Sequence, residues 1–529
     1  MEGLIEEAGE LLLPAAEWGT FNVLDRTILL LLNSNDYSMN ELIRKTIMRC
    51  FLKFIQPLVF MGLGVSSIYA VTDPLIGYVD SVPAVAEEIS TVDENGLTIR
   101  KFRYHSRDNK NLIYAILVTP QDVTGKLPAI MFYHAGGSSA QTEESAAKYF
   151  ANEGFIGMAI SIPSFCNNCS ETIVEGNPNN RSETARLNVE GGPENSALAD
   201  SMIAALEGFN FLAAHPNVDS ANMGVTGTSW GGYTTTMMAG LLTNKVKAAY
   251  SIYGSGYWDR GSFWSPYLAK LSPENLETWL TYYDAGRRAN NITASYFIDA
   301  PTNDTYFWPE AVQATLDVVS SNKNHSFNPN LNHSQASSKS RYQWMVHYLK
   351  DGELPGFAKP TLFSALDNDG QLDLTVDLQI PAGVSIISAN VWYVDPDLAV
   401  TERQWISLPT QKVDDGTYTA QLASTLVENK VIYFMRFEDN LGNYTSTDMG
   451  FSDQIVEPVS SNVGEFPLTF SSEPRASYVL ETSATMESGS WSDVSTFKTE
   501  GSATTILVKR DKDFTKQFWR VRRGDDDEE

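Results

Sequence analysis

Short β-rich segments alternate with helical segments between residues 111 and 350, and this alternation restricts the fold more than any other feature. Strands are predicted at 111–119, 127–133, 155–161, 222–226, 246–253, 294–298 and 326–331, and helices at 143–153, 195–214, 233–242, 308–320 and 338–350. Strands that alternate with helices form a mostly parallel sheet covered on both faces. The sequence therefore predicts a doubly wound α/β domain with its chemistry at the carboxyl ends of the strands.

The pattern changes after residue 352, where short alternating strands with turns between them replace the helices. Such a pattern over residues 357–455 predicts a β-sandwich of the immunoglobulin or fibronectin-III kind. The predicted organisation is a leader at 1–70, an α/β domain at 71–352, the sandwich at 357–455, a small β-rich module at 456–523 and an acidic tail at 524–529.

The leader carries a targeting pattern. Arg44, Lys45, Arg49 and Lys53 precede an apolar run at 54–68, which closes on small residues up to Ala70. This order is typical of a secretory signal peptide, here at about 39–70. The run is short for a membrane span, which needs about 20 apolar residues, although an uncleaved anchor is the alternative. We therefore expect a secreted or periplasmic protein that meets the membrane only through the leader before cleavage.

Export changes the interpretation of the cysteines. Cys166 and Cys169 remain after cleavage and stand in loop-like sequence, so a local disulfide is the first prediction and two free thiols the second. No further zinc ligands stand nearby, so a zinc site is not expected here. The formal net charge of −27 is unsuited to nucleic-acid binding, which needs clustered Lys and Arg.

A nucleophile motif stands between a predicted strand and a predicted helix. The segment Gly227-Thr228-Ser229-Trp230-Gly231 matches G-x-S-x-G. In this context the serine sits on a sharp turn that holds its hydroxyl above the sheet edge. A tight glycine turn with an ordinary serine is the alternative. A serine hydroxyl is a weak nucleophile and needs a base.

The base and the acid should follow Ser229 in the order acid, then histidine. His333 stands just past the last predicted strand and is preferred to His325, which precedes that strand. Asp304 is preferred as the acid because it lies further along the loop after 294–298 and can reach across, whereas Asp299 touches the strand end and is the runner-up. The acid would fix the imidazole tautomer.

An oxyanion needs two backbone N–H donors. One is expected from Trp230, the residue after the nucleophile, and the other from Ala135 or Gly136 in the loop His134-Ala135-Gly136-Gly137. These two candidates are not separated by the sequence. His134 itself is interpreted as an orienting or packing residue.

These motifs together resemble the α/β-hydrolase superfamily, over about residues 90–350. The most similar group contains acetyl xylan esterases, dienelactone-hydrolase-like proteins and catalytic domains of the prolyl-oligopeptidase type. The resemblance implies an α/β-hydrolase fold and a Ser229–His333–Asp304 acyl-transfer mechanism without metal or organic cofactor. Ala135 in the oxyanion loop and Asn332 before the histidine depart from the common pattern.

The segment between 246–253 and 294–298 is rich in aromatic residues and could cover the active site; we call it the aromatic insert (residues 254–293). Trp258 from this insert and Trp308 after Asp304 are the candidates for the substrate pocket, because aromatic faces suit sugar rings. The alternative is that the aromatic residues of the insert form its own small core.

The leading functional prediction is a secreted serine esterase that acts on acetyl or other acyl esters, with an esterified polysaccharide as the expected partner. Two unused N-x-[ST] sequons at the proposed site, Asn303 and Asn332, suit a bacterial exported protein. A peptidase of the prolyl-oligopeptidase type would use the same triad, but no propeller fits before residue 92. A surface-adhesion protein with an inactive hydrolase domain is the third hypothesis.

Overall fold

The computed structural model describes residues 73–166, 171–174, 182–367 and 369–452, together with strands β19 (Glu465–Ser471), β20 (Ser477–Ser483), β21 (Ser492–Lys498), β22 (Ala503–Lys509) and β23 (Phe518–Arg523). The predicted leader, Cys169 and the acidic tail lie outside these residues. Cys166 is disulfide-bonded. No helix of the described residues is long and apolar enough to cross a membrane.

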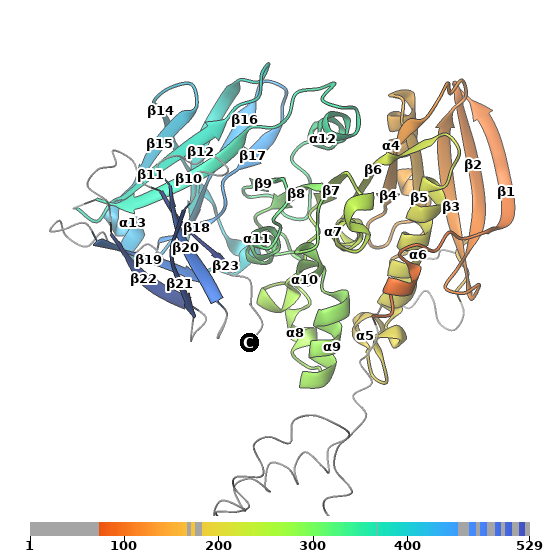
Figure 1. Ribbon diagram of the computed structural model, residues 1–529, viewed down its shortest axis with the longest axis horizontal. Coiled ribbons are helices and arrows are strands. Elements are labelled where there is room, and N and C mark those ends of the chain that lie inside the picture. Colours follow the sequence, from red (N-terminus) through yellow and green to blue (C-terminus); the bar gives the residue numbers. More distant parts are fainter. Residues whose placement is uncertain are drawn as a thin grey trace, which may run out of the picture. The chain divides into compact units, whose positions relative to one another are not determined.

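A nine-stranded sheet in the order β1-β2-β3-β5-β4-β6-β7-β8-β9 forms the centre of the α/β part (Figure 1). Its strands are β1 (Val85–Glu94), β2 (Leu97–Ser106), β3 (Asn111–Pro120), β4 (Leu127–Tyr133), β5 (Ile156–Ile160), β6 (Val218–Thr228), β7 (Ala248–Ile252), β8 (Ser295–Pro301) and β9 (Lys323–Asn328). Strands β4 to β9 pair in parallel, whereas β1, β2 and β3 are antiparallel to their neighbours. The predicted α/β-hydrolase fold class is confirmed.

Helices cover both faces of this sheet, because successive side chains of a buried strand point to opposite sides. Met131 and Tyr133 of β4 join one core, and Ile130 and Phe132 join the other. The first core is closed by α6 (Ala197–Ala213) and α7 (Trp230–Leu242). The second is closed by α4 (Ala140–Asn152) and α12 (Lys339–Leu349).

The hairpin β1–β2 was not predicted. Strand β1 is exposed along almost all of its length, so its sequence carries no alternation of apolar and polar residues. The turn signal was present, because Asn95 and Gly96 both have positive φ, as a two-residue hairpin turn requires. The last parallel strand also differs from prediction: β9 begins at Lys323, so His325 lies inside it.

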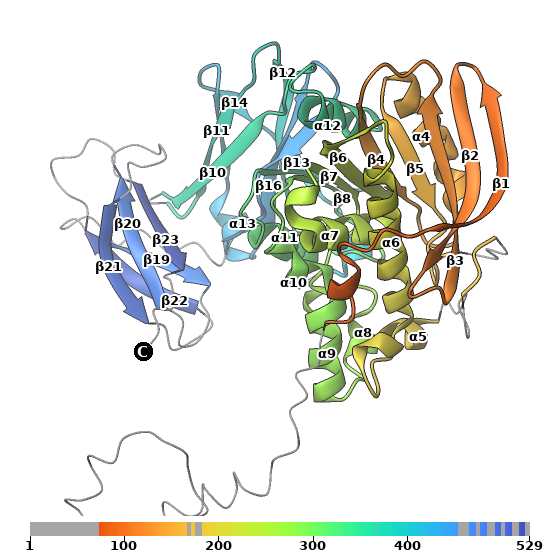
Figure 2. The same cartoon turned by 45° about the vertical axis from the view of Figure 1, so that its right-hand side comes forward.

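The aromatic insert between β7 and β8 is mostly helical. It contains the 3-10 turn η4 (Trp258–Arg260) and the helices α8 (Ser265–Leu268), α9 (Pro273–Tyr283) and α10 (Ala285–Ala289). Helix α5 (Glu183–Leu187), from the segment before α6, lies beside α8 (Figures 1 and 2). Helix α11 (Pro309–Asp317) connects β8 to β9.

Two antiparallel sheets follow the α/β part. Their orders are β10-β11-β15-β14 and β13-β12-β16-β17, with β18 paired to β16. The strands are β10 (Lys359–Leu366), β11 (Leu372–Gln379), β12 (Ile386–Val394), β13 (Ile406–Pro409), β14 (Gln411–Lys412), β15 (Thr417–Leu422), β16 (Ile432–Asp439), β17 (Tyr444–Ser446) and β18 (Gly450–Phe451), with helix α13 (Ser424–Glu428) between β15 and β16. Apolar residues of both sheets share one core, as in a sandwich. The later strands form the antiparallel sheets β19-β22 and β21-β20-β23.

Candidate active site

Ser229 sits on a strained turn between β6 and α7. Its φ is +59°, a value that non-glycine residues rarely adopt, and its backbone N–H donates to the Ile252 carbonyl at 2.8 Å. The turn can be this sharp because its neighbours lack side chains. A Cβ atom on Gly227 would lie 2.4 Å from the Tyr133 carbonyl oxygen, and one on Gly231 would lie 2.0 Å from it. The motif therefore forms the expected nucleophile turn.

The structure brings Ser229, His333 and Asp304 into one hydrogen-bonded chain. His333 Nε2 lies 2.8 Å from Ser229 Oγ, and His333 Nδ1 lies 2.9 and 3.0 Å from the two oxygens of Asp304. Asp304 comes from the loop after β8 and His333 from the loop after β9. Because parallel strands end at the same sheet edge, residues far apart in the chain meet there. This geometry suits a nucleophile, its general base and an orienting acid.

Backbone contacts hold the Asp304 carboxylate in place, in addition to its contact with His333. It is fully buried, and its Oδ1 accepts the backbone N–H groups of Tyr306 and Phe307 at 2.7 and 3.1 Å. The His333 imidazole lies between Tyr253 and Tyr306, whose ring centres are 4.6 and 4.8 Å from its own. The acid and the base therefore have little freedom to turn away from Ser229.

The runner-up residues lie elsewhere. Asp299 is buried and accepts hydrogen bonds from Asn328 and, at 3.3 Å, from the Tyr250 hydroxyl; burial raises its pKa to about 6. His325 Nε2 contacts the Thr447 carbonyl at 3.0 Å, and burial lowers the pKa of its imidazole. Neither is hydrogen-bonded to Ser229 or His333 among the described residues.

The side chain of His134 supports the predicted oxyanion loop through both of its ring nitrogens. Its Nδ1 contacts the Ala135 carbonyl at 2.8 Å, and its Nε2 accepts the Ile162 N–H at 2.9 Å. The Gly137 N–H is engaged by the Phe165 carbonyl at 2.7 Å. Within the described part of the chain, the N–H groups of Ala135 and Gly136 form no hydrogen bond. Both donors therefore stay available at the pocket that Ser229 lines.

A pocket of about 400 Å³ opens over Ser229. Its lining comes from the oxyanion loop, α5, the nucleophile turn, the aromatic insert and the loops after β7, β8 and β9: Ala135, Gly136, Glu183, Arg186, Thr228, Ser229, Trp230, Tyr253, Phe263, Trp264, Tyr306 and His333. Two predicted pocket residues are not in this set. Trp258 stacks on Trp264 with ring centres 4.2 Å apart and donates to the Ser255 carbonyl, inside the core of the insert. Trp308 packs beneath Gly261.

These placements correct the prediction for Trp258 and Trp308. Trp258 packs against two residues that line the pocket, Trp264 and Trp230, without lining it itself. The alternative interpretation, an aromatic core within the insert, therefore describes Trp258. The sequence offered no signal that distinguishes Trp258 from Trp264, because both stand in an irregular segment of the insert.

An ion pair in the pocket wall was also missed. Arg186 is buried and pairs with Glu183 at 2.9 Å, donates to the Ser164 carbonyl and lies 4.7 Å from the Trp230 ring centre. Glu183 also accepts the Trp264 indole N–H at 2.6 Å. The pair thus joins α5, the aromatic insert and the nucleophile turn. No motif marks these residues in the sequence, since only the folded chain brings the three segments together.

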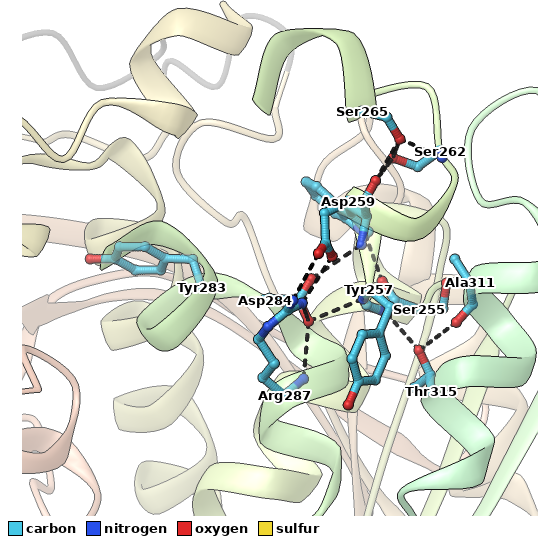
Figure 3. Close-up of polar contacts among 12 residues, drawn as sticks. Ser255, Tyr257, Asp259, Ser262, Ser265, Tyr283, Asp284, Arg287, Ala311 and Thr315 are labelled. Carbon is cyan, nitrogen blue, oxygen red and sulfur yellow. Dashed lines mark hydrogen bonds and ion pairs between the residues drawn. The ribbon is translucent and has the colours of Figure 1, made fainter. Parts of the chain in front are cut away.

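Asp284 anchors the aromatic insert (Figure 3). This fully buried carboxylate accepts the backbone N–H groups of Tyr257, Trp258 and Arg287 at 3.0, 3.2 and 3.0 Å. Burial raises its pKa, and the nearby Arg287 guanidinium opposes that rise. Because Tyr257 has a positive φ of 52°, the loop needs such an anchor to hold its shape. The fixed loop in turn places Trp264 at the pocket.

Among the described residues, no group of three or more His, Cys, Asp or Glu side chains is arranged to hold a metal ion.

Two family models match the chain. The model described as "Acetyl xylan esterase (AXE1)" matches residues 84–257, and the model described as "BAAT / Acyl-CoA thioester hydrolase C terminal" matches residues 206–339. Together they include the oxyanion loop, the nucleophile turn, Asp304 and His333. Both descriptions name hydrolases of acyl compounds.

Acetyl esterase Axe7A of Xylanibacter ruminicola is 24% identical over an alignment of 261 residues that covers 45% of this chain and 56% of that protein. The chain thus spans little more than half the length of this relative. Among solved structures, acetyl xylan esterase 1 from Thermoanaerobacterium sp. JW/SL YS485 has 18% identity and a TM-score of 0.45, and covers 52% of this chain and 92% of its own. The acetyl xylan esterase from Paenibacillus sp. R4 has 16% identity, a TM-score of 0.42 and coverages of 51% and 89%.

Proposed function

Because this chain belongs to the α/β-hydrolase superfamily, we propose that it is a serine esterase that cleaves carboxylic esters. The observation that carries the proposal is the continuous hydrogen-bonded chain from Ser229 Oγ through His333 to the buried carboxylate of Asp304. Ser229 also has a strained positive φ and lies near backbone N–H groups that form no hydrogen bond among the described residues. Catalysis gives a reason for this strain, whereas a protein that only binds its partner has none.

In the proposed reaction His333 Nε2 removes the hydroxyl proton as Ser229 Oγ attacks the ester carbonyl. The N–H of Trp230 and that of Ala135 or Gly136 stabilise the resulting oxyanion. The C–O bond to the alcohol then breaks, and the imidazolium gives its proton to the departing oxygen. Water, deprotonated by His333, releases the acid from the acyl-enzyme and restores Ser229. Asp304 keeps Nδ1 protonated and stabilises the imidazolium.

The proposed substrates are acetyl or other short acyl esters on carbohydrate. The names of the matching family model and of the curated relative support the acetyl group and the carbohydrate. The pocket supports a short acyl chain, because its volume is only about 400 Å³ and Trp230, Trp264 and the Glu183–Arg186 pair contribute to its wall. Secretion or export to a periplasm is part of the same proposal and rests on the leader sequence alone.

Hydrolysis of p-nitrophenyl acetate by the full chain tests the proposal. We expect turnover in the parent and a loss of at least about 10³-fold in kcat for Ser229→Ala and for His333→Ala. Ser220→Ala, at an exposed serine of β6, the strand that leads to Ser229, is the matched control and should retain full activity. Equal turnover by the parent and Ser229→Ala would reject Ser229 as the nucleophile, and inactivity of the parent on every ester tried would reject the esterase.

A further inference from the structure

A second and larger pocket adjoins the catalytic one. Its volume is about 830 Å³, and Thr228, the residue before the nucleophile, lines both pockets. Ile252, whose carbonyl accepts the Ser229 N–H, also lines it. The walls come mainly from α4, along most of its length, and from the first half of α12, and these helices cover the same face of the sheet (Figure 1). A ligand seated here would therefore lie directly beside the reacting ester.

Glu143 and Arg341, of opposite charge, face this pocket without pairing with each other, and the exposed Lys339 also lines it. Glu143 of α4 and Arg341 of α12 both line it, and both are partly buried. Among the described residues, neither forms a hydrogen bond or an ion pair, although each attracts the other electrostatically. A buried charge that is left without a close partner costs free energy, which a ligand can recover. Such a ligand must offer Arg341 an acceptor and Glu143 a donor.

The rest of the lining favours the same kind of ligand. Hydroxyl and amide side chains of Thr142, Ser145, Ser338 and Gln335 line the same pocket. An aromatic wall stands beside them, where half-exposed Tyr149 meets Tyr342 edge to face with ring centres 5.4 Å apart. A sugar ring presents vicinal hydroxyls, each a donor and an acceptor, and an apolar face that packs on tyrosine.

We propose that this pocket binds the saccharide that carries the ester, while the acyl group enters the smaller pocket at Ser229. The inference rests on the proposed esterase activity and assigns its alcohol side. The partly buried Glu143 carboxylate offsets the charge of Arg341 and opposes phosphate groups beside it, as in coenzyme A, whereas the second cation of the lining, Lys339, is exposed to solvent. Hydroxyls that bridge Glu143 and Arg341 would replace the missing ion pair.

Titration calorimetry of the full chain with unesterified oligosaccharides tests this assignment without turnover. The probes are xylotetraose, cellotetraose and chitotetraose, with coenzyme A as the anionic comparison. We expect saturable binding of at least one tetrasaccharide and none of coenzyme A. Binding of no tetrasaccharide, or of coenzyme A alone, would overturn the proposal.

Substitutions locate the binding. Arg341→Met and Glu143→Gln should each raise the Kd of the bound tetrasaccharide by about tenfold or more, since each removes a charge-assisted hydrogen bond. Tyr149→Ser, at a half-exposed side chain that the fold does not need, should raise it several-fold even if the other two variants unfold. Lys110→Met removes an exposed positive charge at a residue that does not line the pocket, and it is the control. Binding that all three pocket variants leave unchanged would place the saccharide elsewhere.

The outcome is separable from that of the esterase proposal. Ser229→Ala should bind the tetrasaccharide like the parent while losing ester hydrolysis. Hydrolysis that survives Ser229→Ala would refute the serine mechanism without touching the saccharide pocket, whereas a parent that hydrolyses p-nitrophenyl acetate but binds no saccharide would refute the pocket alone.

Discussion

The nucleophile turn and the acid–base loops are held in place by different means. Around Ser229 the constraints are backbone contacts made by the motif itself: Gly227 and Gly231 approach the Tyr133 carbonyl, and the Ser229 N–H bonds to Ile252. The loops that carry Asp304 and His333 are instead tied to the β-sandwich. Asn303 donates to the Arg403 carbonyl at 2.5 Å, and Asn330 exchanges two hydrogen bonds with the backbone of Trp405 at 2.8 and 2.9 Å.

This difference assigns a structural task to the sandwich. Arg403 also pairs with Glu310 at 2.5 Å, and Arg436 donates to Asn328 at 3.0 Å. Each of these contacts ends within a few residues of Asp304 or His333. The nucleophile turn is thus held by contacts within the α/β part, at Tyr133 and Ile252, whereas the loops of the acid and the base also depend on the sandwich, about 100 residues further along the chain.

The largest expected effect is at the acid itself. Asp304→Asn should lower kcat on p-nitrophenyl acetate by about 10⁴-fold with little change in stability, because an amide can stabilise the wrong imidazole tautomer. Steady-state kinetics and a thermal unfolding curve measure both quantities. Asp351→Asn, at an exposed carboxylate, is the control. A loss of less than tenfold would remove Asp304 from the mechanism.

The next largest effect is expected from a substitution that disrupts the nucleophile turn. Gly231→Ala should lower the free energy of unfolding by about 4 kcal/mol, because the added methyl would overlap the Tyr133 carbonyl oxygen. Denaturant unfolding measures it. Gly77→Ala introduces a methyl group into open space and should leave stability almost unchanged. Equal stability of the two variants would contradict the account of the turn.

Asn328 contacts both Asp299, near the end of β8, and Arg436 of the sandwich. The contribution of Asp299 to stability should depend on pH. Its folded pKa of about 6 lies above the ordinary 3.8, so the folded state holds a proton that the unfolded state has released. Stability from this group is therefore full below about pH 4 and is lost as the pH rises through 6, by roughly 3 kcal/mol.

Asp299→Asn should remove that dependence. Comparison of denaturant unfolding at pH 4 and pH 7 should show a steeper loss of stability in the parent than in the variant. Parallel curves for the two proteins would indicate that the Asp299 carboxyl titrates normally in the folded state.

The smallest expected effect is at the sandwich contact. Asn330→Ala removes the pair of hydrogen bonds to Trp405 and should cost about 1 to 2 kcal/mol of stability. The kcat should fall by about tenfold, because the His333 loop begins next to this contact. Asn244→Ala, at an exposed position, is the control. Unchanged kcat with reduced stability would show that the sandwich stabilises the chain without positioning the base.

Local patterns predicted much of this molecule. The alternation of strands and helices indicated the parallel sheet, and the glycines around Ser229 indicated the turn, because both depend on neighbours in sequence. Asp304 and His333 were preferred on chain order and on their distance past a strand end, and the structure brings both to Ser229. The sequence carried no comparable signal for the exposed strand β1, or for the finding that Trp264 and not Trp258 lines the pocket.

Periodicity and turn chemistry are local properties of the chain, so they were enough to predict the fold class and the order of the candidate catalytic groups. The surroundings of these groups became visible only in the folded structure. The Glu183–Arg186 pair, the Asp284 anchor of the aromatic insert, the unpaired Glu143 and Arg341, and the sandwich contacts at Asn303 and Asn330 all join segments that are distant in sequence. Such contacts depend on how elements pack against one another, and no spacing along the chain encodes that packing.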